Sequence, residues 1–132
     1  MDTKEISQEN VKTLVKLGID TNDIAEVYLS ITKRGADISK DTYINNLTEK
    51  LKFFQARNNN IVDEQEDKII LKEDVLNMIK RNKDLVIMDI DKKIKPLCDK
   101  LDSYYFMNTG FTNSVIKSNP KIFNVKSINS VI

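Results

Sequence analysis

Apolar residues recur three or four positions apart through the first half of the chain, which is the spacing of one face of an α-helix. The first such segment runs from Ser7, a residue type that caps helix N-termini, to Gly18, which suits the left-handed conformation after a helix C-terminus. The three Asn residues at 58–60 are poor helix formers and predict a loop. The same signals predict two helices in between, from Asp20 or Thr21 to Gly35 and from Ser39 or Asp41 to Phe54.

The second half of the chain repeats the helical spacing but interrupts it with polar breaks. A helix is predicted from near Glu73, whose charge suits a helix N-terminus, to near Asn82. The continuous apolar run Leu85–Met88 is interpreted as an extended connection. Asp89 is expected to cap the next helix. Pro96 lacks the N–H of an interior helical residue, so it is predicted to kink that helix or to fix its start.

Turn residues are scarce, with three Gly and two Pro in 132 residues, and a fold of many short strands would need more of them. We therefore predict a single all-α domain over residues 1–132, of about six to eight helices. The alternative is a small α+β winged-helix-like domain, in which Ile69–Leu71 and Leu85–Met88 pair as two strands. The residues predicted to be in the core are Leu76, Ile79, Leu97, Leu101 and Phe123.

The second half of the chain contains an internal repeat, because a shift of 37 residues aligns the segment from Met78 to Val86 with the segment from Val115 to Phe123. A short helix predicted over residues 113–118 then coincides with the end of the helix that ends near Asn82, and the break at Asn119-Pro120 coincides with Asn82 and Lys83. Helix–break–helix units of about 35 residues predict a short helical repeat of the α-solenoid type. The aligned pairs include Met78 with Val115, Ile79 with Ile116, Lys80 with Lys117, Leu85 with Ile122 and Val86 with Phe123.

Two segments carry a more specific pattern, a helix, an Asn-Pro-x-apolar-apolar break and a second helix. They are LKEDVLNMIKRNKDLVIMDIDKKIKPLCDKL at Leu71–Leu101 and GFTNSVIKSNPKIFNV at Gly110–Val125, about a third of the chain together. This pattern resembles the mitochondrial transcription termination factor (mTERF) family. The chain departs from it at Lys83, where the break proline is missing, and in its first residues, which are acidic and unlike a transit peptide.

The resemblance implies a curved all-helical repeat that binds nucleic acid along a basic concave surface. The residues carried over are the cations of the matched segments, together with Lys83, which departs from the family pattern. These candidate nucleic-acid-binding residues are Lys80, Arg81, Lys83, Lys92, Lys93, Lys95, Lys117 and Lys121.

The net charge of +1 hides a division of the chain into an acidic and a basic half. Residues 1–67 carry nine Lys and Arg against 13 Asp and Glu, a net of −4, whereas residues 68–132 carry 12 against seven, a net of +5. The acids between Ile61 and Asp67 predict a solvated linker near residues 58–68 that separates the halves. A basic half can neutralise the phosphates of RNA or DNA. The alternative is that its lysines are the solvated outer faces of their helices.

Residues that carry catalysis are scarce. The chain has no His, and its single cysteine, Cys98, lies among apolar neighbours and is expected to be buried. The acidic segment 61–67 lacks the glycine and the ligand spacing of a calcium loop. Asp89 and Asp91 suit the start of a helix better than acid–base chemistry. We therefore expect a non-enzymatic protein without a metal or cofactor.

No apolar run approaches the roughly 18 residues of a membrane span, so we expect a cytoplasmic protein without membrane contact. Protein binding is the second class of function. An acidic and a basic half can pair in a homodimer or with a charged partner, as in an adaptor or inhibitor from a mobile element or phage. The sequence favours weak nucleic-acid binding through the basic C-terminal half.

Overall fold

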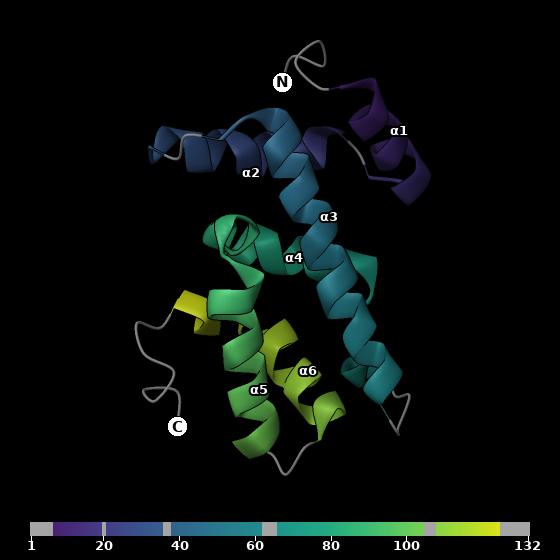
Figure 1. Ribbon diagram of the computed structural model, residues 1–132, viewed down its shortest axis with the longest axis vertical. Coiled ribbons are helices and arrows are strands. Elements are labelled where there is room, and N and C mark those ends of the chain that lie inside the picture. The colour runs from purple at the N-terminus through teal and green to yellow at the C-terminus, as the bar shows by residue number, and fades with distance from the viewer. Residues whose placement is uncertain (1–6, 20, 36–37, 62–65, 105–107, 125–132) are drawn as a thin grey trace. The chain divides into compact units, whose positions relative to one another are not determined.

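The computed structural model of the protein describes residues 7–19, 21–35, 38–61, 66–104 and 108–124. Within these ranges the chain forms six α-helices joined by short 3-10 and π-helical segments, and none of these residues lies in a β-strand (Figure 1). The prediction of an all-α fold is confirmed. The winged-helix-like alternative is wrong, because Ile69–Leu71 form no strand and Leu85 lies in a turn of 3-10 helix.

The chain divides into two compact units, residues 1–49 and residues 50–132. The division falls inside α3, which runs from Lys40 to Ala56 and contributes to both units. The segment near residues 58–68, predicted as a linker between halves, lies within the second unit, and its residues 62–65 fall outside the described residues.

The first unit contains α1 (Gln8–Leu17), α2 (Thr21–Lys33) and the first part of α3. The predicted end signals of α1 are present. The Ser7 hydroxyl accepts a hydrogen bond from the Asn10 backbone N–H at 3.3 Å, and Gly18 has a left-handed φ of 68°. Gly35 after α2 has a positive φ of 97°. Glycine adopts this conformation at little cost, so both helices end near the glycines that predicted their ends.

Asp41 joins the start of α3 to the start of α1. Its carboxylate accepts hydrogen bonds from the Asn10 side-chain amide at 2.9 Å and from the Ser7 backbone N–H at 2.8 Å. The Asn10 bond, followed by the Ser7 bond, holds the pKa of Asp41 below its ordinary value. Apolar side chains from the three helices are buried in this unit: Leu14, Ile24, Val27, Ile31, Tyr43, Ile44 and Leu47.

The second unit contains the end of α3 and three further α-helices, α4 (Lys72–Arg81), α5 (Lys95–Tyr104) and α6 (Thr109–Ser118). Its 3-10 helices are η2 (Arg57–Asn60), η3 (Glu66–Lys68), η4 (Lys83–Ile87) and η6 (Pro120–Asn124), and a π-helical segment, η5, spans Ile90–Ile94. α5 and α6 lie side by side (Figure 1).

Two irregular segments of the second unit differ from the prediction. The Asn run at 58–60, expected as a loop, is a turn of 3-10 helix, and it is held by the Asn58 side chain, which bonds both the N–H and the C=O of Ile70 at 2.8 Å. The run Leu85–Met88, expected to be extended, begins in η4. Helical winding buries both Leu85 and Val86, whereas an extended chain would direct neighbouring side chains to opposite faces.

The starts of the last helices follow from local hydrogen bonding. Asp89 caps η5 as predicted, because its carboxylate accepts from the Lys92 N–H at 2.9 Å. Pro96 has no N–H for the Lys92 carbonyl, and the helix changes from π to α at Lys95, so this proline does lie at the start of α5. α6 begins at Thr109, earlier than the predicted 113, because the Asn108 side chain caps it.

The core of the second unit includes four of the five residues predicted to be buried. Ile79, Leu97, Leu101 and Phe123 are buried, but Leu76 is only half-buried. The buried stripe of α4 consists of Val75, Met78 and Ile79, and Leu76 lies about 100° around the helix from Val75. Cys98 is fully buried as expected, and this burial raises the pKa of its thiol to about 12.

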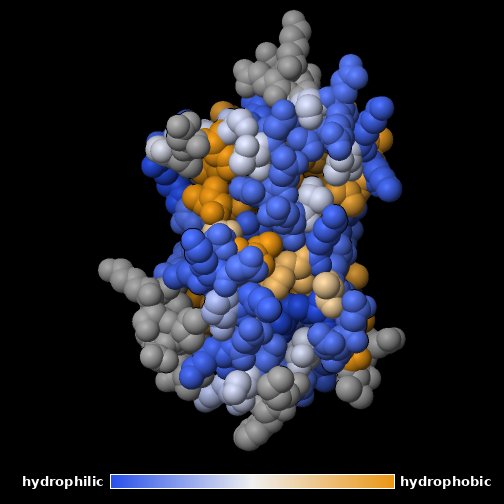
Figure 2. Space-filling view, in the orientation of Figure 1, coloured by the Kyte–Doolittle hydropathy of each residue, from blue (hydrophilic) through white to orange (hydrophobic). Residues whose placement is uncertain are grey.

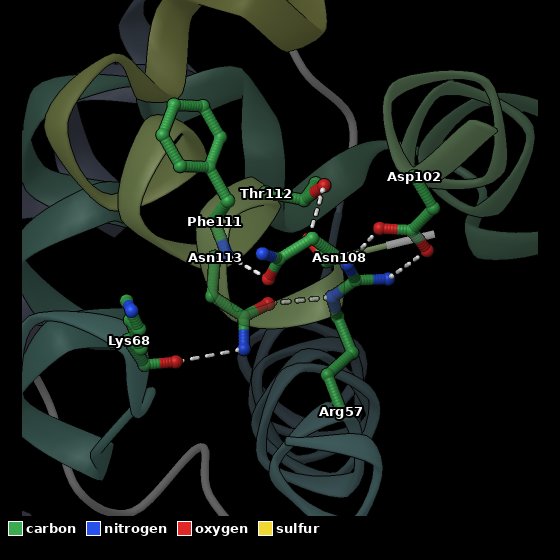
Figure 3. A network of polar contacts seen from close by, with 7 residues as sticks. All are labelled: Arg57, Lys68, Asp102, Asn108, Phe111, Thr112 and Asn113. Atoms are coloured by element: carbon green, nitrogen blue, oxygen red, sulfur yellow. Dashed lines mark hydrogen bonds and ion pairs between the residues drawn. The ribbon is translucent and has the colours of Figure 1, made fainter. Parts of the chain in front are cut away.

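A polar network lies inside this core (Figure 3). Arg57, at the start of η2, forms an ion pair with Asp102 of α5 at 2.7 Å, and its Nε donates to the Asn113 side chain of α6 at 2.7 Å. The Asn113 amide then donates to the Lys68 carbonyl at 3.0 Å. The Arg57 and Asp102 side chains are 9% and 12% exposed, so removing either charge would leave the other buried and unpaired.

We expect Arg57→Met to lower the free energy of unfolding by about 3–5 kcal/mol, because Asp102 would keep its buried charge without a cation. The measurement is urea unfolding, with Lys52→Met as the control, since Lys52 is exposed. The double variant Arg57→Met with Asp102→Leu should recover much of the loss. An equal cost for Arg57→Met and Lys52→Met would contradict a stabilising role for the pair.

Candidate nucleic-acid interface

The 37-residue shift found in the sequence is also present in the structure. α4 (72–81) corresponds to α6 (109–118), and η4 (83–87) corresponds to η6 (120–124), so each pair of elements begins and ends 37 residues apart. We call residues 72–87 the first motif and residues 109–124 the second motif.

The two motifs turn the chain in the same way. The corner residues Asn82 and Asn119 have nearly equal φ angles of −136° and −134°, and ψ angles of 88° and 62°. Each corner N–H bonds the carbonyl four residues earlier, at 2.8 Å to Met78 and at 2.9 Å to Val115. The aligned segments therefore have one local structure, a helix, an Asn corner and a 3-10 turn. A solenoid arrangement of such units stays a prediction.

The C-terminal end of α4, in the first motif, caps the C-terminal end of α6, in the second motif. Arg81 donates to the Lys117 and Ser118 carbonyls, at 3.3 and 2.8 Å, which are at the C-terminus of α6. The Asn82 amide donates to the Pro120 carbonyl at 2.9 Å and is buried. Since carbonyls in the last turn of a helix lack partners within it, the two Arg81 bonds satisfy groups of α6 that would otherwise need water.

Lys117 makes the return contact from the second motif. Its Nζ donates to the Ile69 carbonyl at 2.7 Å and lies 3.2 Å from the Asp74 carboxylate. Asp74 also accepts from the Leu71 N–H at 2.8 Å, at the start of α4. Lys117 and Arg81 therefore both contribute to holding the motifs together, one at each end of α4.

A surface cleft of about 420 Å³ lies at this seam between the motifs, lined by Asp74, Asn77, Lys80, Arg81, Lys117 and Ser118. It brings together three of the eight predicted cations, Lys80, Arg81 and Lys117, with a single carboxylate, Asp74. Asp74, Asn77 and Arg81 are three and four residues apart on one face of α4. Asp74, Asn77 and Ser118 were not among the predicted site residues. The signal that could have found the first two is their helical spacing from Arg81.

The other five predicted cations do not line this cleft. Lys83 and Lys93 are half-buried, in η4 and η5. Lys92 in η5, Lys95 in α5 and Lys121 in η6 are exposed. Their role in binding stays a prediction.

In the part of the chain that the structure describes, no group of His, Cys, Asp and Glu residues could hold a metal ion, and no helix has the length and apolar character to cross a bilayer. The face shown in Figure 2 is mostly hydrophilic and carries small hydrophobic patches. Asp89, considered with Asp91 for acid–base chemistry, caps a helix.

Comparison with protein-family models, with curated proteins and with solved structures finds no match to the chain. The mTERF resemblance stays a prediction.

The equivalent corner residues provide a matched pair of substitutions. We expect Asn82→Ala to lower the free energy of unfolding by about 1–3 kcal/mol, because a buried hydrogen bond to the Pro120 carbonyl is lost. Asn119→Ala should cost less than about 0.5 kcal/mol, because Asn119 is exposed and, among the described residues, its side chain bonds Val115 within its own helix end. Thermal and urea unfolding measure both. Equal costs would show that the seam does not depend on Asn82.

Proposed function

We propose that the protein is a non-enzymatic binding module of the cytoplasm, and that its second unit binds RNA or DNA weakly by holding backbone phosphates at the seam cleft. The observation that carries this proposal is the convergence of Lys80, Arg81 and Lys117 on one cleft with a single carboxylate among them. Three cations against one anion leave an excess of positive charge where an anionic ligand can enter.

The cleft suits a phosphate better than a base edge. Arg81 is exposed, and two of its nitrogens already bond backbone carbonyls, which fixes the guanidinium in position before a ligand arrives. Lys117 is oriented by Ile69 and Asp74 in the same way. Pre-oriented cations lose little freedom on binding and attract any phosphodiester, so contacts of this kind position a nucleic acid without reading its sequence.

Lys80→Gln is the sharpest test, because Lys80 is exposed and Arg81 and Lys117 also support the fold. Loss of one phosphate contact should weaken binding to all sequences by similar factors and reduce the slope of log affinity against log salt by about one. Fluorescence anisotropy with labelled RNA and DNA, titrated at several salt concentrations, measures both quantities.

The matched control is Lys12→Gln, which removes one exposed lysine from α1 in the first unit and should leave the slope unchanged. The double variant Lys92→Gln with Lys95→Gln tests whether η5 and α5 also contact phosphates, in which case it too should reduce the salt slope. Equal slopes for Lys80→Gln and the unmodified protein would remove the cleft from the proposal. Absence of salt-dependent binding by the unmodified protein would end the proposal itself.

A protein partner is the second candidate, and one observation in the first unit favours it. Val11 and Val15, four residues apart on α1, are 38% and 75% exposed and form a small apolar face. In this case the chain is an adaptor or an inhibitor, or it forms a homodimer. Val15→Asp would then abolish capture of the partner, or dissociate the dimer in sedimentation, without changing any salt-dependent binding of RNA or DNA.

A further inference from the structure

An aromatic ring lies exposed on the helix that forms one side of the seam cleft. Phe111, in the first turn of α6, is 46% exposed. The Asn108 side chain accepts a hydrogen bond from the Phe111 backbone N–H at 3.0 Å, so the helix cap fixes the backbone position of Phe111. Figure 3 shows its ring directed away from the Arg57 network. The Phe111 ring therefore takes no part in the polar network around Arg57.

Phe111 shares one face of α6 with Ser118, one of the two α6 residues that line the cleft. Ser118, which lines the cleft, is seven residues after Phe111, so the two lie on the same side of the helix, about 10 Å apart along its axis. The residues between them on this face, Ser114 and Val115, are half-buried. Partly exposed side chains therefore lie between the aromatic ring and Ser118, which lines the cleft together with the cations.

The two elements of the second motif carry positive charges and no negative ones. α6 and η6 contain Lys117 and Lys121 but no Asp or Glu. A nucleic acid that extends from the cleft toward Phe111 therefore meets no carboxylate of these two elements. An acidic face would have repelled it, and an entirely apolar face would have offered no phosphate contact.

We propose that the ligand of the cleft is a single-stranded nucleic acid, with a phosphate held at the cleft and a neighbouring base stacked on Phe111. This inference rests on the proposed function and adds the strandedness of its ligand. Stacking on an aromatic side chain requires an unpaired base whose flat face is open, and the bases of a duplex are already stacked on each other. Duplexes then bind through phosphates alone.

The test compares a short labelled oligothymidine with the duplex that it forms with its complement, for the unmodified protein and for Phe111→Leu. Leu keeps an apolar side chain but removes the ring. We expect Phe111→Leu to weaken binding of the single strand about fivefold or more, the low end of the range for one stacked base, and to leave duplex affinity unchanged. Phe111→Tyr should retain most of the single-strand affinity, since it keeps the ring.

The outcomes separate the two proposals. Unchanged single-strand affinity in Phe111→Leu, together with a reduced salt slope in Lys80→Gln, overturns the stacking inference and supports phosphate binding. Equal losses for single strand and duplex in Phe111→Leu also overturn it, because the ring would then act through the fold. Thermal unfolding of each variant shows whether the substitution has destabilised the fold. No binding of either probe by the unmodified protein overturns both proposals.

Discussion

A buried guanidinium holds several elements of the second unit together. Arg57 lies where the chain leaves α3, and burial of its charge is tolerated only because Asp102 of α5 and Asn113 of α6 both reach it. Asn113 extends the constraint to the η3 carbonyl of Lys68. Satisfying one cation therefore fixes two helices and a connecting segment around it. The network therefore contributes, with the seam contacts of Arg81 and Lys117, to the position of α6.

The repeated motif shows how one local structure can serve two purposes. The helix and the Asn corner recur with matching hydrogen bonds, because the backbone geometry needs only nearby residues. The contacts made by the corners differ. Arg81 and Asn82 of the first motif bond the carbonyls of the second, whereas Asn119 bonds within its own helix end. Lysines at equivalent positions, Lys80 and Lys117, meet at the cleft because the two motifs pack together.

Interactions over three or four residues were the ones that the sequence predicted well. The caps at Ser7 and Asp89 and the repeat itself depend on local spacing, so their residue types identified them. The Arg57 network joins Arg57 to Asp102, which is 45 positions further along the chain, and to Asn113, which is 56 positions further. No local sequence pattern predicts such distant partners. For the same reason the sequence predicted three cations of the cleft, Lys80, Arg81 and Lys117, but not the cleft itself. Pairing of Lys117 with Asp74 depends on how α4 and α6 pack, and this packing is a tertiary property.

The burial of Cys98 determines when this residue can be oxidised. Its sulfur is fully buried, and the raised pKa keeps it in the unreactive thiol form. Oxidants and alkylating reagents therefore reach it only when α5 separates from its neighbours. Chemical damage at this position is confined to molecules that have already opened, and the rate of damage reports how often opening occurs. The fraction of molecules modified at Cys98 therefore increases with the frequency of local unfolding around α5.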